Sequence, residues 1–452
     1  MTLHLRGLYA AIAIVLFGLF STETASAEAR KLKHHMKIQE VTSPGGITAW
    51  LVSEHSVPLI ALRFAFEGGS SQDPENKPGV ANFLTAMLDE GAGEFKASEF
   101  HEKIEDIAMR MGFSDGRDAF YGSVQTLSEN KTEAFELLTL ALSKPRFDVD
   151  ALERMRKQLL TGLAFAAKSP NRIAQKEWWA KAYPDHPYGR PSTGTSESIQ
   201  DISAQDLIDY HARVFAKSNL KISVVGDITA DELRPLLDKV FGELPEQARI
   251  KPVSPAQITN DGRLNVIQMP FPQSVAVLGM EGILRDDPDF VAAYVMNHIL
   301  GGGGFSSRLM QEVREKRGLA YSVSSHLVSY GQAATLMAFV ATKNEEVAQS
   351  IDVIRNEMRR MASDGVTEKE LSDAQSYLTG SYPLRFDTNS KIAGQLLAIQ
   401  LDELGIDYVN VRNDRIAAVT KDDIKRLAKR LLKTKSLSLT VVGQPQNLTT
   451  DG

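Results

Sequence analysis

A repeated segment constrains the fold of this chain more than any other feature. The 30 residues that start at Ile199 recur, without a gap, from Ile416, 217 positions later. Each copy has the pattern of an amphipathic helix followed by an apolar strand, KISVVG in the first copy and SLTVVG in the second. This agreement predicts two homologous domains of about 200 residues each, which is a usual domain size.

Matched helix starts support the alignment of the two copies. Ser203 pairs with Thr420, and both residue types are favoured N-caps. Asp206 and Asp423 follow three residues later, where the acid of a capping box belongs. The copies therefore share local folding signals as well as an apolar pattern.

A polar stretch from Leu244 to Arg263, with Pro252 and Pro255, indicates a linker between the domains. We place a first domain at 28–247, the linker at 248–262 and a second domain at 263–446. Strands and helices are interleaved in both domains, with expected elements at Thr48–Val52, Leu59–Phe66, Thr132–Ser143, Leu264–Gln268, Ser274–Met280 and Glu345–Ser363. Short turns favour antiparallel neighbours, so the expected class is α+β, with two mainly antiparallel sheets that are each covered by helices.

The N-terminus has the three parts of a secretory signal peptide. Arg6 supplies the positive charge, Leu8–Phe20 is apolar but too short to span a bilayer, and Ala25-Ser26-Ala27 is a cleavage signal. We expect residues 1–27 to be removed before Glu28, which leaves a periplasmic or secreted protein without stable membrane insertion. The alternative is an uncleaved membrane anchor.

Composition excludes several kinds of site. The chain has no cysteine, which excludes disulfides, thiolate ligands and a thiol nucleophile. A net charge of −6 gives no reason to expect nucleic acid binding. The nine histidines form neither H-E-x-x-H nor H-x-x-E-H. His34-His35 is expected in a solvated tail, Asp185-His186-Pro187 in a turn rather than a ligand set, and His298 near the end of a helix.

The segment GVANFLTAMLDEG, residues 79–91, has the pattern of a short amphipathic helix. Asn76 and Pro78 occupy positions suited to a cap and a first-turn proline, and Gly91 a position suited to the helix end. Asn82, Thr85 and Ala86 share one face at a spacing suited to metal ligands, but their side chains are poor zinc ligands.

The run Gly301, Gly302, Gly303 and Gly304 is the most conspicuous loop. A phosphate-binding loop would need a following lysine, which is absent. The remaining interpretations are a flexible connection between helices and a peptide-contacting loop, since glycine lets another backbone come close. Further on, Arg314 is expected on a helix that Gly318 ends, with Arg317 in its last turn, and Tyr321 at the start of a strand. Pattern alone makes Arg314 a surface charge and Tyr321 a half-buried aromatic residue.

Several of these segments together resemble the pitrilysin/insulinase-type zinc peptidases, which include the processing peptidase of mitochondria. The resemblance rests on GVANFLTAMLDEG, YPDHPYGRPSTGTSESIQDIS, the two VVG strands, GGGGFSSRLMQEVREKRGLAYSV and GVTEKELSDAQSYLTGSY, and so spans nearly the whole expected mature chain. It implies a fold like that of the mitochondrial processing peptidase. In that family the histidines of H-x-x-E-H and a downstream glutamate bind zinc, and the motif's glutamate activates water.

This sequence departs from the family at each of those four positions. Asn82 and Ala86 stand for the histidines, Thr85 for the glutamate of the motif, and Gly162 for the downstream ligand. The expectation is therefore no metal and no cofactor in this chain. Arg314 and Tyr321, seven residues apart, match the family's arginine–tyrosine pair, which holds the substrate and stabilises the oxyanion.

The resemblance implies a non-catalytic subunit of a periplasmic zinc peptidase, inert alone. Its partner would be a homologous chain with an intact H-x-x-E-H motif and the zinc, and its substrate a peptide. One alternative is a purely structural or peptide-binding homologue, like the family-related core subunits of a respiratory complex. Another is a self-sufficient peptidase with relocated ligands, for which the sequence shows no clustered histidine and glutamate set.

Overall fold

The computed structural model describes residues 36–259 and 262–448, and from Ile38 onward the chain forms one compact unit. The predicted signal peptide and His34-His35 lie outside the described residues. Within the described part, no helix is long and apolar enough to cross a membrane.

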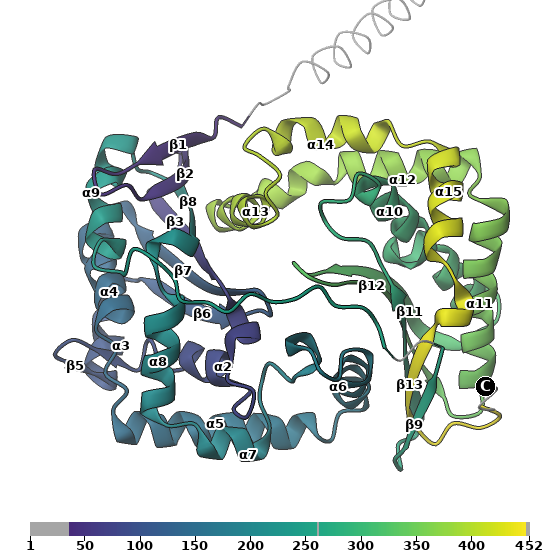
Figure 1. The fold of residues 1–452 in the computed structure, drawn as a ribbon. Coiled ribbons are helices and arrows are strands. Elements are labelled where there is room, and N and C mark those ends of the chain that lie inside the picture. Colours follow the sequence, from purple (N-terminus) through teal and green to yellow (C-terminus); the bar gives the residue numbers. More distant parts are fainter. Residues whose placement is uncertain (1–35, 260–261, 449–452) are drawn as a thin grey trace, which may run out of the picture. The chain divides into compact units, whose positions relative to one another are not determined.

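Two sheets with the same strand order form the framework (Figure 1). The first has the order β1-β2-β8-β3-β7-β6, with β1 Gln39–Thr42, β2 Thr48–Ser53, β3 Leu59–Glu67, β6 Arg110–Asp115, β7 Ala119–Leu127 and β8 Leu220–Gly226. The second has the order β9-β13-β10-β12-β11, with β9 Leu264–Gln268, β10 Gln273–Glu281, β11 Ala320–Ser329, β12 Ala334–Lys343 and β13 Ser438–Gly443. Without β1, the two orders correspond strand for strand.

Pairing directions and register extend this correspondence. Each sheet has one parallel pair, β2 with β8 and β9 with β13, and all its other pairs are antiparallel. Arg63 pairs with Ser223 in the first sheet and Val277 with Thr440 in the second, and Ser223 and Thr440 are related by the 217-residue repeat. Arg63 and Val277 therefore occupy equivalent positions. The predicted α+β class with two homologous, mainly antiparallel sheets is confirmed.

Helices connect and cover the strands. In the first half they are α2 Val80–Thr85, α3 Ala97–Asp106, α4 Lys131–Ser143, α5 Val149–Ala166, α6 Pro170–Ala182, α7 Ser196–Asp201, α8 Ala204–Val214 and α9 Ala230–Phe241. In the second half they are α10 Phe290–Asn297, α11 Val347–Asp364, α12 Glu368–Gly380, α13 Asn389–Leu401, α14 Tyr408–Ala417 and α15 Lys421–Leu431. A two-residue ladder, β4 Gly91–Ala92 with β5 Phe95–Lys96, completes the described elements of the first half. Capping boxes start α8 at Ser203 and α15 at Thr420, as the repeat predicts.

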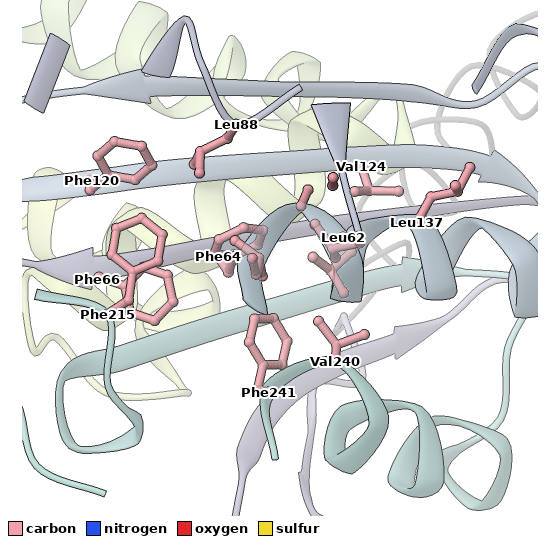
Figure 2. Packing of buried hydrophobic residues seen from close by; sticks show 14 of the residues in the cluster. Leu62, Phe64, Phe66, Leu88, Phe120, Val124, Leu137, Phe215, Val240 and Phe241 are labelled. Carbon is pink, nitrogen blue, oxygen red and sulfur yellow. The ribbon is translucent and has the colours of Figure 1, made fainter. Parts of the chain in front are cut away.

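Each half has its own apolar core on one face of its sheet. Every second residue along β3 points into the first core, as the two-residue strand period requires; Leu62, Phe64 and Phe66 are three of them (Figure 2). There the ring of Phe66 stacks on that of Phe215 at 4.3 Å between centroids. The second core is also made of buried apolar side chains, which include Leu278, Val295, Leu336, Ile354, Leu427 and Val441.

The other face of each sheet is covered by a helix from the opposite half (Figure 1). Helix α13 of the second half packs on β8 and β3, and α6 of the first half packs on β10 and β13. The α6 contact is aromatic, with Trp178 fully buried against Gly279. This exchange makes each half part of the other's packing.

The helix predicted at 79–91 is shorter than expected. Helix α2 spans Val80–Thr85, and Gly79 precedes it in a left-handed conformation with φ +99°. Asn76 does not cap it; instead the carboxylate of Asp73 accepts hydrogen bonds from the backbone N–H groups of Gly79 and Ala81, at 2.7 and 2.8 Å. The prediction was wrong because the cap comes from a residue outside the helical pattern.

The predicted linker carries neither helix nor strand in its described residues and is bound to both halves. The main chain of Lys251 exchanges two hydrogen bonds with the side chain of Gln72, at 2.9 and 2.7 Å. The N–H of Ala256 donates to the carbonyl of Gln332 at 2.8 Å. The domain limits at 27, 247 and 262 stay predictions.

Candidate functional site

The positions that match the family's zinc ligands lie on two helices in contact, α2 and α5. The Asn82 amide donates to the carboxylate of Asp115 on β6, 2.9 Å away. The Thr85 hydroxyl donates to the carbonyl of Asn82 at 2.6 Å. The side chain of Ala86 has no atom that could bind a metal. A Cβ added at Gly162 would have no atom within 4 Å apart from the backbone of its own helix. The helix scaffold is present, but its polar groups are engaged within the chain.

Two carboxyl groups, the buried Asp73 and the half-buried Asp115, lie beside this spot. Burial raises the pKa of Asp73 to about 7, against the lowering effect of its backbone hydrogen bonds, and the nearby Asp115 raises it further. Burial also raises the pKa of Asp115, which the hydrogen bond from Asn82 partly offsets. Sequence reasoning missed both residues, because neither lies in a recognisable metal or catalytic pattern.

These residues do not fit zinc. Zinc is held by imidazole, thiolate or carboxylate groups, commonly four in a structural site and three with water in a catalytic one. The four positions supply one amide, one hydroxyl and no other ligand atom from a side chain. Among the residues that the structure describes, no group of three or more His, Cys, Asp or Glu side chains is arranged to hold a metal ion.

Arg314 and Tyr321 come together in the second half. Arg314 lies on a π-helical turn, Met310–Glu315, and Tyr321 lies in a bulge at the start of β11. The guanidinium carbon of Arg314 is 4.9 Å from the centre of the Tyr321 ring and 4.7 Å from that of Phe305. Tyr321 is 82% exposed, so the expectation of a half-buried ring was wrong. The bulge turns the ring out of the sheet.

The polar ends of this pair are available to a ligand. Within the described chain, neither the guanidinium of Arg314 nor the hydroxyl of Tyr321 makes a hydrogen bond, and the carboxylate of Glu315 is 3.8 Å from Nε of Arg314. Phe305 was not predicted as a site residue; its place just after the glycine run is the only sequence signal for it. The arrangement presents two donors on a surface supported by aromatic rings.

A buried acid within the π-helical turn, Glu312, binds two cations that follow the turn. Glu312 accepts from Lys316 and Arg317, each at 2.6 Å, and Arg317 also donates to the carbonyl of Glu312 at 2.7 Å. Although burial opposes ionisation, these cations hold the pKa of Glu312 below its ordinary value. Arg317 thus satisfies a helix carbonyl, as expected of a helix-end residue, and it also takes part in this charge cluster.

The glycine run lies where two short helical turns, His298–Gly302 and Gly304–Ser306, meet. A second π-helical turn, His298–Gly302, leads into it, and Gly304 adopts φ +58° with open space around it. A side chain at Gly301 would begin 2.6 Å from the backbone nitrogen of Ser325 on β11, so that position requires glycine. The ring of His298 stacks on Tyr377 at 5.1 Å.

The predicted sites do not form a single centre within this chain. No hydrogen bond, ion pair or ring contact of the described residues joins the α2–α5 positions to Arg314 or Tyr321. A cavity of about 1470 Å³, lined by residues of both halves, includes none of the predicted site residues. His186 has a turn role, since Nδ1 accepts from the N–H of Tyr188 and Nε2 lies 2.9 Å from the carbonyl of Ser254.

Comparison with known proteins assigns the family. Residues 50–196 match the family described as insulinase, peptidase family M16, and residues 201–378 match the domain described as peptidase M16 inactive domain. The chain belongs to the insulinase family of peptidases. A Helicobacter pylori relative of this insulinase-family chain, described as non-peptidase homolog YmxG, is 29% identical over 338 residues, or 74% of this chain and 78% of that protein.

Comparison with solved structures agrees with this assignment. A peptidase M16 inactive domain from Pseudomonas fluorescens is 29% identical, with a TM-score of 0.85 over 92% of this chain and 100% of that chain. A chain of complex III2 from Candida albicans is 16% identical, with a TM-score of 0.77 over 92% of this chain and 98% of that chain, which shows the fold alone. The predicted family resemblance is confirmed, and this chain is an inactive homologue within the family.

Proposed function

We propose that this chain is the non-catalytic subunit of a zinc peptidase outside the cytoplasm. Its partner is a homologous chain with an intact H-x-x-E-H motif, which supplies the metal and the water-activating glutamate. The chain described here supplies substrate-binding and oxyanion-stabilising groups. The expected signal peptide supports a periplasmic or secreted location.

One observation carries this proposal: the zinc positions are unsuited to metal, whereas Tyr321 is exposed and the partly exposed Arg314 lies over its ring, with neither polar group hydrogen-bonded within the described residues. A guanidinium and a phenol can both donate to a peptide carbonyl oxygen as negative charge develops on it. An arginine and a tyrosine stacked on a surface without other hydrogen bonds serve no evident purpose in the folding of the chain itself.

The glycine run supports a peptide as the substrate. Gly304 has open space around it and carries no side chain of its own, so that a peptide backbone can approach the loop beside Phe305. The ring of Phe305, 65% exposed, offers an apolar contact next to Arg314. The loop and the pair together form one substrate-contacting surface.

Reconstitution with a zinc-bearing homologue tests the proposal. We expect the two chains to co-purify and to co-sediment at micromolar concentration, through an interface of roughly 2,000 Å² or more as in obligate pairs. Peptidase activity on fluorogenic peptides should exceed the sum of the separate chains. Two chains that sediment separately and gain no activity on mixing would overturn the subunit role.

A further inference from the structure

The duplication allows the two helix-covered sheet faces to be compared position by position. In the second sheet, Val277 is fully buried, and Trp178 of α6 fills the space above Gly279. In the first sheet, the equivalent of Val277 is Arg63, which is half-buried. The equivalent of Gly279 is Ala65, on which Leu397 of α13 packs. The contact of α6 with the second sheet is thus aromatic and apolar. The equivalent contact of α13 with the first sheet has a smaller side chain, Leu397, and a charged neighbour, Arg63.

The space left in the first sheet is a cavity of about 300 Å³, the lower end of the range for small-molecule sites. Its lining includes Arg63, Ser114, Tyr121, Gly394 and Asp402. The space beside Gly394 is empty, because a Cβ added there would meet no atom within 4 Å. A larger residue at this position would place its side chain in that space.

Strand register places three polar side chains on the cavity face. Ser114 on β6 pairs directly with Tyr121 on β7, and Tyr121 pairs with Ala65 on β3. Arg63 lies two residues before Ala65 and therefore on the same face, opposite to the core-facing Phe64. The guanidinium and two hydroxyl groups thus share one surface.

The charge of Arg63 is not neutralised by the described chain. Its Nη2 donates to the neutral hydroxyl of Ser390 at 2.7 Å, and no carboxylate of the described residues forms an ion pair with it. Burial accordingly lowers the pKa of Arg63. The acid that lines the cavity, Asp402, is bound to Arg285 at 2.9 Å. A partly buried cation without a counter-ion is unfavourable, and an anion removes the penalty.

Two further cations lie near the cavity. An adjoining open cavity shares Arg63 and Gly394 and is lined by two more cations, Arg385 and Lys391. Lys391 is paired with Asp387 at 2.8 Å, and Arg385 contacts the hydroxyl of Tyr294 at 3.3 Å. Burial raises the pKa of Tyr121, so its hydroxyl stays protonated and can donate.

We propose that the cavity beneath α13 binds a carboxylate, with the Arg63 fork as the main donor and the hydroxyls of Tyr121 and Ser114 as supporting donors. Two parallel N–H donors of a guanidinium match the two oxygens of a carboxylate. The volume suits a small organic acid or the C-terminal carboxylate of a short peptide. This site is separate from Arg314 and Tyr321 and does not depend on a partner chain.

Calorimetric titration of the isolated chain tests the assignment. The probes are acetate, N-acetyl-dialanine with a free carboxylate, the same peptide as its C-terminal amide, and inorganic phosphate. We expect the free acid to bind and the amide not to bind. If acetate binds as tightly as the free-acid peptide, the cavity accepts any small carboxylate. If only the peptide binds, the ligand is the C-terminal carboxylate of a peptide. Tighter binding of phosphate, or equal binding of acid and amide, would overturn the proposal.

Two variants locate the binding. Arg63→Met should weaken the acid's affinity about ten- to a hundredfold, since hydrogen bonds to charged groups contribute that much. Arg63→Lys should keep part of it, because the charge remains while the fork is lost. Arg234→Met, which removes an exposed cation from α9, is the matched control and should bind like the unaltered chain. The loss of affinity counts only if the thermal unfolding curve of the variant is unaltered. An affinity for the acid that Arg63→Met does not change would also overturn the site. Failure here leaves the subunit role untouched, because that role is tested by reconstitution.

Discussion

At the scale of single residues, Arg314 and Tyr321 should act on the reaction rather than on the fold. Tyr321 is exposed and Arg314 is partly exposed, and removing one oxyanion donor typically lowers kcat about 10²–10³-fold. We expect Arg314→Ala or Tyr321→Phe to lower turnover of the reconstituted complex to that extent, with zinc content and assembly unchanged. The double change should have less effect than the sum of the two, because both serve one oxygen.

The Arg314 variant needs a control arginine that lies outside the charge cluster around Glu312. Arg317 is unsuitable, since it binds the buried Glu312 and its loss would disturb the turn that carries Arg314. Arg359 on α11 is exposed and its guanidinium contacts only the carbonyl of Arg355 among the described residues. Steady-state kinetics on several peptides should show Arg359→Ala unchanged. Equal kcat for Arg314→Ala and the unaltered complex would show that Arg314 takes no part in the reaction.

Asp73 should link stability to pH. Burial raises its pKa from the ordinary 3.8 to about 7, so between these values the folded chain holds a proton that the unfolded chain releases. The free energy of unfolding therefore falls as pH rises through this window, by on the order of a few kcal/mol. Thermal unfolding from pH 4 to 8 should show a shallower fall for Asp73→Asn than for the unaltered chain. Exposed Asp231→Asn should keep the original slope, and parallel slopes for all three would contradict the assignment.

At the scale of elements, regular patterns were predictable from sequence and distant partners were not. The six strands and helices expected from apolar period lie within two residues of their predicted ends, because their signals are local. Helix α2 was misjudged because its cap, Asp73, lies six residues before Gly79 and outside any capping pattern. The exposure of Tyr321 depends on a bulge, and the cavity at Arg63 on a helix from the other half. None of these has a local sequence signal.

The exchanged helices make a prediction about packing. The first carbon of any side chain at Gly279 would lie 2.1 Å from the Trp178 ring, so Gly279→Ala should destabilise the chain by about 1–3 kcal/mol through overpacking. Adding Trp178→Leu reproduces the Leu397-on-Ala65 contact of the first sheet, so the double variant should lose less than the two single losses added. Denaturant unfolding measures each loss. Strictly additive losses would show that the two residues do not share one space.

At the scale of the whole molecule, the duplication was predictable because one repeat links both halves, whereas their exchange of helices was not. The family departures were predictable as well, since Asn82, Thr85, Ala86 and Gly162 are visible in the sequence. What the structure adds is where the polar groups at these positions are engaged: Asn82 donates to Asp115, and Thr85 donates to the carbonyl of Asn82. Helices α2 and α5 are in contact without metal ligands at these positions, and Phe83 and Leu84, beside them, are buried.

The proposed division of labour between two chains makes metal stoichiometry a property of their assembly. The isolated chain should carry no bound zinc after dialysis, and the reconstituted pair should carry one zinc per two chains. The combined change Asn82→His, Thr85→Glu, Ala86→His and Gly162→Glu should add a second, since α2 and α5 still pack together and the space at Gly162 is open. Gly162→Glu alone should add none, because affinity depends on ligand number and geometry together. Elemental analysis decides between these values. Near one zinc per isolated unaltered chain would mean that ligands outside α2 and α5 hold metal, and the division of labour between two chains would then fail with it.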